Sequence, residues 1–311
     1  MAQGDTSEMD AVEPGQPSAD EILAAIRSAG WLLEQETETA LRAAGYYTQM
    51  GHAFPDPDDP AVSREIDVTG YRQLFRDDAL ALSVGVRVIA ECKQSTMPYV
   101  LIGRPPLDGV AGRTRVEQQL RFDRVEIGST PTGDNSRRID TVDAREYLGL
   151  RNLPGNPWDA DFVATQMTRL DRKKTWLADN RGVFTSLVYP LAKALTYFRA
   201  THKRGSYVDH KPGRDWASIE FYYPVVVTSA PIHAVDVSQA ELRPRRVPWT
   251  TMSRQIQAHN VSGHFYVDVV TAEALRDYLS ERIGVFADEV TRIAEANPKR
   301  FVTREDHTYS K

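Results

Sequence analysis

The sequence has few of the features that mark secreted or membrane proteins. Cys92 is its single cysteine, which excludes an intramolecular disulfide and a zinc site built from several cysteines. No segment approaches the roughly 20 consecutive apolar residues that a membrane-spanning helix needs, and the N-terminus lacks the basic and apolar regions of a secretory signal. We therefore expect a cytoplasmic protein that does not bind a membrane.

Several common catalytic patterns are also missing. The seven histidines show no metal-ligand spacing, and no serine occupies the turn between strand and helix that activates a serine nucleophile. The glycine-rich loop that cradles nucleotide phosphates is absent as well. These absences argue against hydrolysis through a covalent serine intermediate and against an ATP-driven motor.

The net charge is small, but charged residues are unevenly distributed along the chain. The net charge is -5, yet residues 1–65 alone have a balance of -10, so the rest of the chain carries +5. Locally basic segments are residues 113–124, 169–174, 199–214 and 243–246. Such segments suit contact with a phosphate backbone, although runs of charge are commonly solvated surface.

The chain is long enough for one large domain, which we place at residues 18–311 after a flexible polar tail at residues 1–17. Ser18 and Glu21 have the spacing of a capping box, which predicts a helix through Ile26. Gly30 is expected to bend or break this helix. A second helix is predicted over residues 31–44, and Gly45 suits its C-terminal cap.

Two segments alternate polar and apolar residues with the period of a β-strand. They are residues 65–69, which contain Asp67, and residues 82–93. In the second strand the valines and Cys92 share one face, while Glu91 and Lys93 share the other. We therefore expect Cys92 to be buried as a small apolar residue.

The rest of the chain gives weaker signals. Residues 97–181 lack clear periodicity and predict an irregular insertion with some helix. Beyond it the sequence predicts an amphipathic helix at 183–199 that Pro190 starts or kinks, strands at 221–228, 232–237 and 265–270, and C-terminal helices over about 271–296. The first of these is expected to be capped by Thr271, and the last to cover 285–296.

Asp67, Glu91 and Lys93 form the strongest chemical pattern. Two carboxylates on the same side of adjacent strands repel each other unless a cation lies between them, and hard oxygen ligands select Mg²⁺ or a similar ion. Lys93 projects from the same face as Glu91, where its ammonium group would lie near a metal-bound water and a scissile phosphate. The pattern predicts a metal-dependent phosphodiesterase site.

The order of these features resembles the PD-(D/E)XK nuclease superfamily, also called restriction endonuclease-like, and is most similar to its Mrr-like and junction-resolvase-like branches. The resemblance implies an α/β fold, a restriction endonuclease-like mixed β-sheet flanked by helices. The long insertion after the Glu-x-Lys strand is a departure from the minimal core of the superfamily. It implies that Asp67 and Glu91 bind Mg²⁺ or Mn²⁺, that Lys93 is the superfamily's lysine, and that Gln94 is the polar residue that often follows it. Glu34 resembles the helix-borne glutamate, a third metal ligand.

The sequence leaves alternatives open at each position. Ile66 stands where the motif's name has proline. Glu38 lies one turn after Glu34 on the same helix face, and Glu65 shares the face of Asp67. Glu91 and Lys93 alone would make an ordinary surface ion pair.

The resemblance implies a nuclease acting on nucleic acid, with DNA preferred over RNA, in phage defence, restriction or DNA repair. The alternatives are a catalytically silent nucleic-acid-binding or assembly subunit with the same fold, and a purely structural protein. A homodimer, with the C-terminal helices as its surface, and a partner protein from a defence or repair system are further expectations. Four aromatic residues would either stack bases or fill the core: Tyr222, Tyr223, Phe265 and Tyr266.

Overall fold

The computed structural model describes residues 16–106, 118–119, 124–133, 136–151, 153–156, 160–204 and 216–302. Nearly all of the predicted tail, residues 1–17, lies outside the described residues. The same holds for most of the basic segment 113–124 and for much of the basic segment 199–214. The basic segments 169–174 and 243–246 are described in full.

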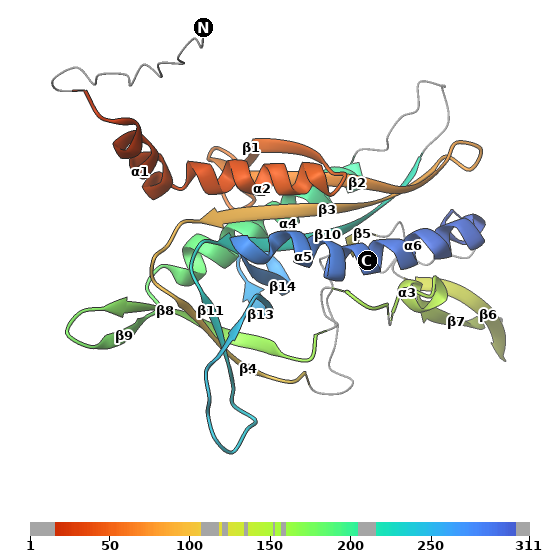
Figure 1. The fold of residues 1–311 in the computed structure, drawn as a ribbon. Coiled ribbons are helices and arrows are strands. Elements are labelled where there is room, and N and C mark those ends of the chain that lie inside the picture. Colours follow the sequence, from red (N-terminus) through yellow and green to blue (C-terminus); the bar gives the residue numbers. More distant parts are fainter. Residues whose placement is uncertain are drawn as a thin grey trace, which may run out of the picture.

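The described part of the chain is a mixed α/β structure built on one large sheet (Figure 1). The strands of this sheet are β1 (Tyr47–Pro55), β2 (Ser63–Asp77), β3 (Leu82–Lys93), β4 (Tyr99–Arg104), β5 (Gln118–Gln119), β8 (Val163–Arg172), β9 (Trp176–Asp179), β10 (Ala217–Thr228), β11 (Ile232–Asp236), β12 (Arg245–Val247), β13 (Trp249–Gln257) and β14 (Ser262–Thr271). Their order is β1-β2-β3-β10-β14-β13-β8-β4-β11-β12, with β5 paired to β10 and β9 to β8. Strands β1, β2 and β3 are antiparallel, whereas β3, β10 and β14 run parallel.

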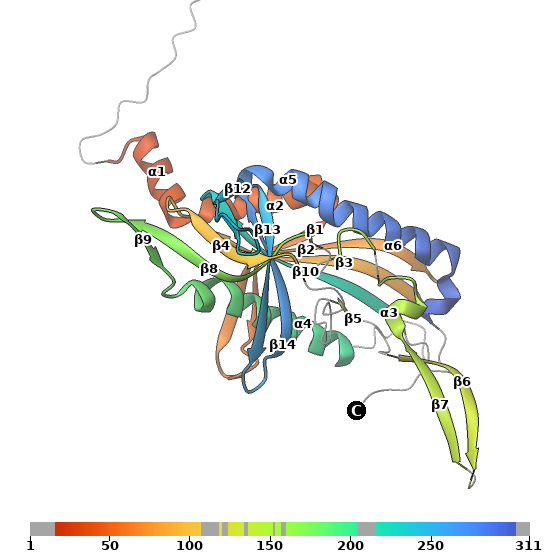
Figure 2. The same cartoon turned by 90° about the horizontal axis from the view of Figure 1, so that it is seen from below.

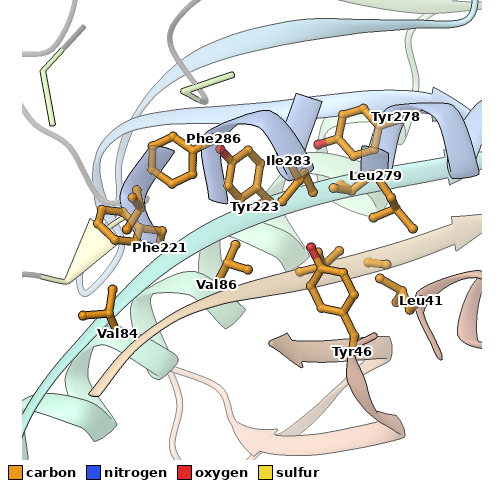
Figure 3. Packing of buried hydrophobic residues seen from close by; sticks show 14 of the residues in the cluster. Leu41, Tyr46, Val84, Val86, Phe221, Tyr223, Tyr278, Leu279, Ile283 and Phe286 are labelled. Carbon is orange, nitrogen blue, oxygen red and sulfur yellow. The ribbon is translucent and has the colours of Figure 1, made fainter. Parts of the chain in front are cut away.

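One face of the sheet is covered by α2 (Trp31–Ala43) and by a nearly continuous C-terminal helical segment. This segment consists of η2 (Ala272–Ala274), α5 (Leu275–Tyr278), η3 (Leu279–Gly284) and α6 (Val285–Ala296), and η4 (Pro298–Phe301) follows it. Figure 3 shows its apolar side chains, among them Leu279, Ile283 and Phe286, packed over Val86 and Tyr223 of the sheet. The predicted C-terminal helices are thus confirmed, and their apolar stripe forms part of the protein's own core.

The opposite face is covered by η1 (Phe184–Val188) and α4 (Tyr189–Arg204), which continue one another. Leu187, Leu191 and Leu195 are buried there against residues such as Ile89 and Val226. The amphipathic helix predicted at 183–199 is therefore confirmed, and Pro190 lies within it, one residue after the change from η1 to α4.

The N-terminal helices form as their caps predict. Helix α1 (Ala19–Ala29) has a complete capping box between Ser18 and Glu21, and it ends at Gly30, whose φ of 89° is left-handed. Gly45, just after α2, also has a positive φ of 83°, which glycine adopts without steric cost. Helix α1 has no buried residue, so its sequence, and not packing, specifies it.

The prediction that residues 97–181 are irregular was wrong, although the segment does contain some helix, as expected. The described part of this segment contains two strands of the main sheet, β4 and β8, which pair with each other. It also contains α3 (Ala144–Tyr147) and a separate hairpin of β6 (Arg124–Gly133) and β7 (Ser136–Asp143), which projects from one end of the molecule (Figure 2). Strands β4 and β8 are far apart in the sequence, so no local turn signal connects them.

Two further details correct the sequence predictions. Thr271 stands at the N-cap position of η2, but its hydroxyl donates to the carbonyl of Pro248 and makes no capping bond. Strand β13 was not predicted at all. Among the described residues, no helix is long and apolar enough to cross a membrane.

Candidate functional site

Strands β2 and β3 bring Asp67 and Glu91 onto neighbouring positions of the sheet. Their backbone pairing runs from Asp77 and Leu82 to Val68 and Ala90, one step before the two carboxylates. At the next residue pair the side chain of Asp67 replaces the backbone as the hydrogen-bond acceptor. Its Oδ2 accepts a hydrogen bond of 2.6 Å from the backbone N–H of Cys92. Asp67 is thereby held in a fixed position beside Glu91.

The backbone around Asp67 is kinked. Gly51 of β1 lies opposite Asp67 in the register, between the pairs Met50–Val68 and His52–Ile66, and has a positive φ of 57°. Ile66 and Val68 would share one face of a regular strand, yet Ile66 packs into the core under α4 and Val68 into the core under α2. The change of face occurs at Asp67 and turns its carboxylate towards Glu91.

Glu91 and Lys93 project from the same face of β3, as predicted, and their side chains form an ion pair of 2.7 Å. Burial raises the pKa of Glu91 to about 7, and the negative charge of Asp67 adds to this effect. Burial acts to lower the pKa of Lys93, but the charge of Glu91 outweighs it and the pKa is raised. A buried carboxylate and a lysine that stays charged therefore lie side by side.

Helix α2 directs Glu34, and not Glu38, towards this pair of strands. Burial raises the pKa of Glu34, and the charges of Asp67 and Glu65 raise it further. Glu38 instead accepts a hydrogen bond from Thr48 of β1 and pairs with Arg42. The charges of four carboxylates, those of Glu34, Glu65, Asp67 and Glu91, thus influence one another at this end of the sheet.

The position of α2 is set by its contact with β3. Thr37 is buried and its hydroxyl contacts the sulfur of Cys92 at 3.4 Å. Glu34 precedes Thr37 by three residues and therefore lies on the same side of the helix. Cys92 is buried among apolar residues, as predicted, and burial raises the pKa of its thiol to about 12.

Gln94 lies at the rim of the site. It is exposed and follows the last residue of β3. A β-carbon placed on Gly30 would lie 3.5 Å from the Cβ atom of Gln94, so the junction between α1 and α2 passes beside it. The structure thus brings all five predicted site residues to one end of β3.

Residues that the sequence did not single out complete this end of the sheet. The hydroxyl of Ser229, just after β10, accepts from the backbone N–H of Ser95 at 2.9 Å and donates to the carbonyl of Ser95 at 3.0 Å. Tyr99 of β4 is buried, and its phenol lies within the electrostatic reach of both Lys93 and Arg169 of β8. No local pattern marks these residues, because strands distant in the sequence bring them together.

The donor set at the site is chemically suited to a hard cation. It consists of carboxylate oxygens, the ligands that Mg²⁺ and Mn²⁺ prefer. Asp67 and Glu91 each have one oxygen engaged, by the Cys92 N–H and by Lys93, which leaves the other oxygen of each carboxylate for a ligand. However, the described residues contain no group of three His, Cys, Asp or Glu side chains placed closely enough to hold a metal ion.

The aromatic residues considered for base stacking belong to the core. Tyr222, Tyr223, Phe265 and Tyr266 are all buried. Tyr223 contacts the ring of Phe286, and its hydroxyl donates to the carbonyl of Gly155. The described surface at the site therefore offers none of these four rings to a base.

Comparison of the chain with protein-family models, with curated protein sequences and with solved structures finds no match. The resemblance to PD-(D/E)XK nucleases accordingly rests on the motif residues and on the order of the elements around them.

Proposed function

We propose that the chain is a metal-dependent nuclease with the restriction endonuclease-like fold, hydrolysing phosphodiester bonds in DNA. The observation that carries this proposal is the meeting of Asp67, Glu91 and Lys93 on β2 and β3, beside Glu34 of α2. Apart from the elements of the insertion and η1, which lie between β3 and α4, the order of elements is α2-β1-β2-β3-α4-β10, with β3 parallel to β10. This order agrees with the core expected for the superfamily.

Asp67 and Glu91 would hold Mg²⁺ or Mn²⁺, with Glu34 as the third carboxylate. When bound, the ion would supply Lewis-acid activation of a water molecule and of the phosphate. Two desolvated carboxylates of like charge disfavour each other, so a divalent cation between them would relieve a repulsion already present in the protein.

Lys93 would act on the phosphate itself. Its side chain is one third exposed, so the ammonium group is accessible from outside while Glu91 holds it in place. A positioned cation next to a scissile phosphate stabilises the charge that develops on the phosphate oxygens in the transition state. Gln94, at the rim, would donate a hydrogen bond to the phosphate backbone.

The decisive experiment compares the wild-type protein with Lys93→Ala on circular, linear, single-stranded and branched DNA and on RNA, with Mg²⁺ or Mn²⁺. We expect cleavage by the wild type and a loss of about 100-fold or more in the variant, the effect of removing one transition-state donor. Circular dichroism verifies that the variant folds. Undiminished cleavage by folded Lys93→Ala protein would contradict the proposal.

Helix α2 provides a matched pair of variants. Glu34→Gln removes a charge next to Asp67, and Glu38→Gln removes the same charge one turn later, where it contacts Thr48 and Arg42. We expect Glu34→Gln to lower the apparent affinity for Mn²⁺ in the cleavage assay and Glu38→Gln to leave it unchanged. Equal effects of the two variants would remove Glu34 from the site.

A second candidate is a nucleic-acid-binding or assembly subunit without catalysis. Two observations favour it: Lys93 already occupies one oxygen of Glu91, and no group of three metal donors is present in the described residues. Calorimetric titration with Mn²⁺ separates the two candidates. A nuclease should bind the ion and release or take up heat, and Glu91→Gln should abolish this signal. A binding-only subunit should show no such heat. The homodimer, the partner protein and a role in defence or repair stay predictions of the resemblance.

A further inference from the structure

Strands β8 and β9 form an arm of the main sheet that extends beyond the pairing of β8 with β4. Pairing between β4 and β8 stops at Tyr99 and Arg169, whereas β8 continues to Arg172. From there the arm is a two-stranded ribbon, paired from Arg169 with Asp179 to Arg172 with Trp176. At about 3.3 Å per residue, the stretch from Arg169 to the turn spans roughly 15 Å.

The arm carries an excess of positive charge at its tip. Its two acidic residues each pair with an arginine near the base: Asp171 with Arg169 at 3.0 Å and Asp179 with Arg181 at 2.8 Å. The exposed cations at the tip are Arg172, Lys173 and Lys174. Within the described residues, none of these three forms an ion pair, so their charge faces solvent.

The tip also exposes apolar groups. Trp176 is 50% exposed and Leu177 48%, and the guanidinium group of Arg172 lies over the indole ring at 5.4 Å. The cation holds the indole ring in a fixed orientation, so a base can stack on the ring with little loss of side-chain freedom. Solvated charge alone would not require an exposed tryptophan next to it.

Tyr99 connects the base of the arm with the candidate nuclease site. It is the register partner of Arg169 across β4 and β8. Burial raises the pKa of its phenol, and the charges of both Arg169 and Lys93 act against this effect. Figures 1 and 2 both place the arm at the same end of the molecule as α1, and Figure 1 shows β3 ending there. In both views the β6–β7 hairpin lies at the opposite end.

We propose that the β8–β9 arm, residues 169–181, is a substrate arm that enters the major groove of duplex DNA and holds the duplex against Glu91 and Lys93. The inference rests on the proposed function, because it takes the bound duplex to be the substrate. A two-stranded β-ribbon fits the B-form major groove, which is about 12 Å wide. The deep and narrow major groove of an RNA duplex does not admit it, so the arm selects DNA.

The test measures binding and cleavage separately. Binding of a fluorescent DNA duplex of about 30 base pairs is followed by anisotropy without divalent cations, at several salt concentrations, for the wild type and for Lys173→Ala/Lys174→Ala. Each lysine that contacts a phosphate contributes about 0.9 to the salt slope. We therefore expect the slope to fall by about 2 and the Kd to rise about 10- to 100-fold at 0.1 M salt.

The β6–β7 hairpin supplies the matched control. Arg137→Ala/Arg138→Ala also removes two exposed charges from a hairpin, but from the end of the molecule far from β9. We expect this variant to bind DNA like the wild type. Trp176→Ala should weaken binding with little change in the salt slope, because it removes stacking and no charge. Thermal melting verifies that all variants stay folded.

The possible outcomes separate the two proposals. Cleavage by the wild type together with equal DNA binding by the arm and control variants overturns the arm and leaves the nuclease intact. Arm-dependent binding without cleavage by the wild type supports the arm contact and overturns hydrolysis. Equal arm-dependent affinity for an RNA duplex overturns entry into the major groove.

Discussion

Replacing Asp56 with alanine would remove the carboxylate that neutralises a buried lysine. The ammonium group of Lys193, on α4, donates to both oxygens of Asp56 at 2.7 Å, and the side chains are only 7% and 3% exposed. Asp58 lies further away, at 3.1 Å from the same nitrogen. The pair joins the loop after β1 to the helix that covers the sheet.

The expected cost follows from this burial. Removing one partner of a buried ion pair costs about 3–5 kcal/mol, because the remaining charge is left in a poorly solvated position. Asp58 stays in place and compensates in part, so we expect a loss near the lower limit, about 3 kcal/mol. Removing both charges in Asp56→Ala/Lys193→Met should restore part of the lost stability.

Urea denaturation followed by circular dichroism measures this loss. The control is Asp78→Ala, which breaks the Arg76–Asp78 pair, whose side chains are 50% and 75% exposed. An exposed pair contributes only about 0–1 kcal/mol. A loss below about 1 kcal/mol for Asp56→Ala, similar to that of the control, would refute the reasoning from burial.

The same pair predicts how stability depends on pH. Burial acts to raise the pKa of Asp56, but hydrogen bonds from Lys193 and Arg64 outweigh it and lower the pKa to about 2. A lowered pKa in the folded state means that the stabilisation is complete above about pH 4, the ordinary pKa of aspartate, and is lost as the pH falls towards 2. Asp56→Ala should show a weaker acid dependence in this range.

Three further predictions concern the fold. Cys92 should resist alkylation in the native protein at pH 8 and react fully in urea; rapid native labelling would contradict its burial. Gly103→Ala should destabilise the protein by about 1–3 kcal/mol or more in the same denaturation assay, because the added carbon would lie 2.2 Å from the carbonyl oxygen of Val163. Gly128→Ala is the control: its added carbon meets nothing within 4 Å, so the stability should not change. Ser18→Ala should speed amide exchange in α1 without lowering the global stability, since α1 buries no residue; a matching global loss would show that α1 packs on the domain.

Local pattern was sufficient to determine several elements. The alternation along residues 82–93 determines which side chains of β3 share a face, so Cys92 is buried while Glu91 and Lys93 meet. The capping box at Ser18 and the positive φ at Gly30 and Gly45 depend on neighbouring residues alone. Periodicity and capping act within a few residues, which is why the sequence by itself predicts them.

Tertiary structure decided what local pattern left open. Glu34 and Glu38 lie one turn apart on the same face of the predicted helix, so the sequence does not distinguish them. The packing of Thr37 on Cys92 directs Glu34 towards the carboxylates of Asp67 and Glu91. Strands β4 and β8 were missed because each is paired with segments far along the chain, and their pairing is what places Arg169, at the base of the arm, opposite Tyr99. The physical reason is the same in both cases: contacts between distant segments depend on how helices and strands pack, and local periodicity does not encode that packing.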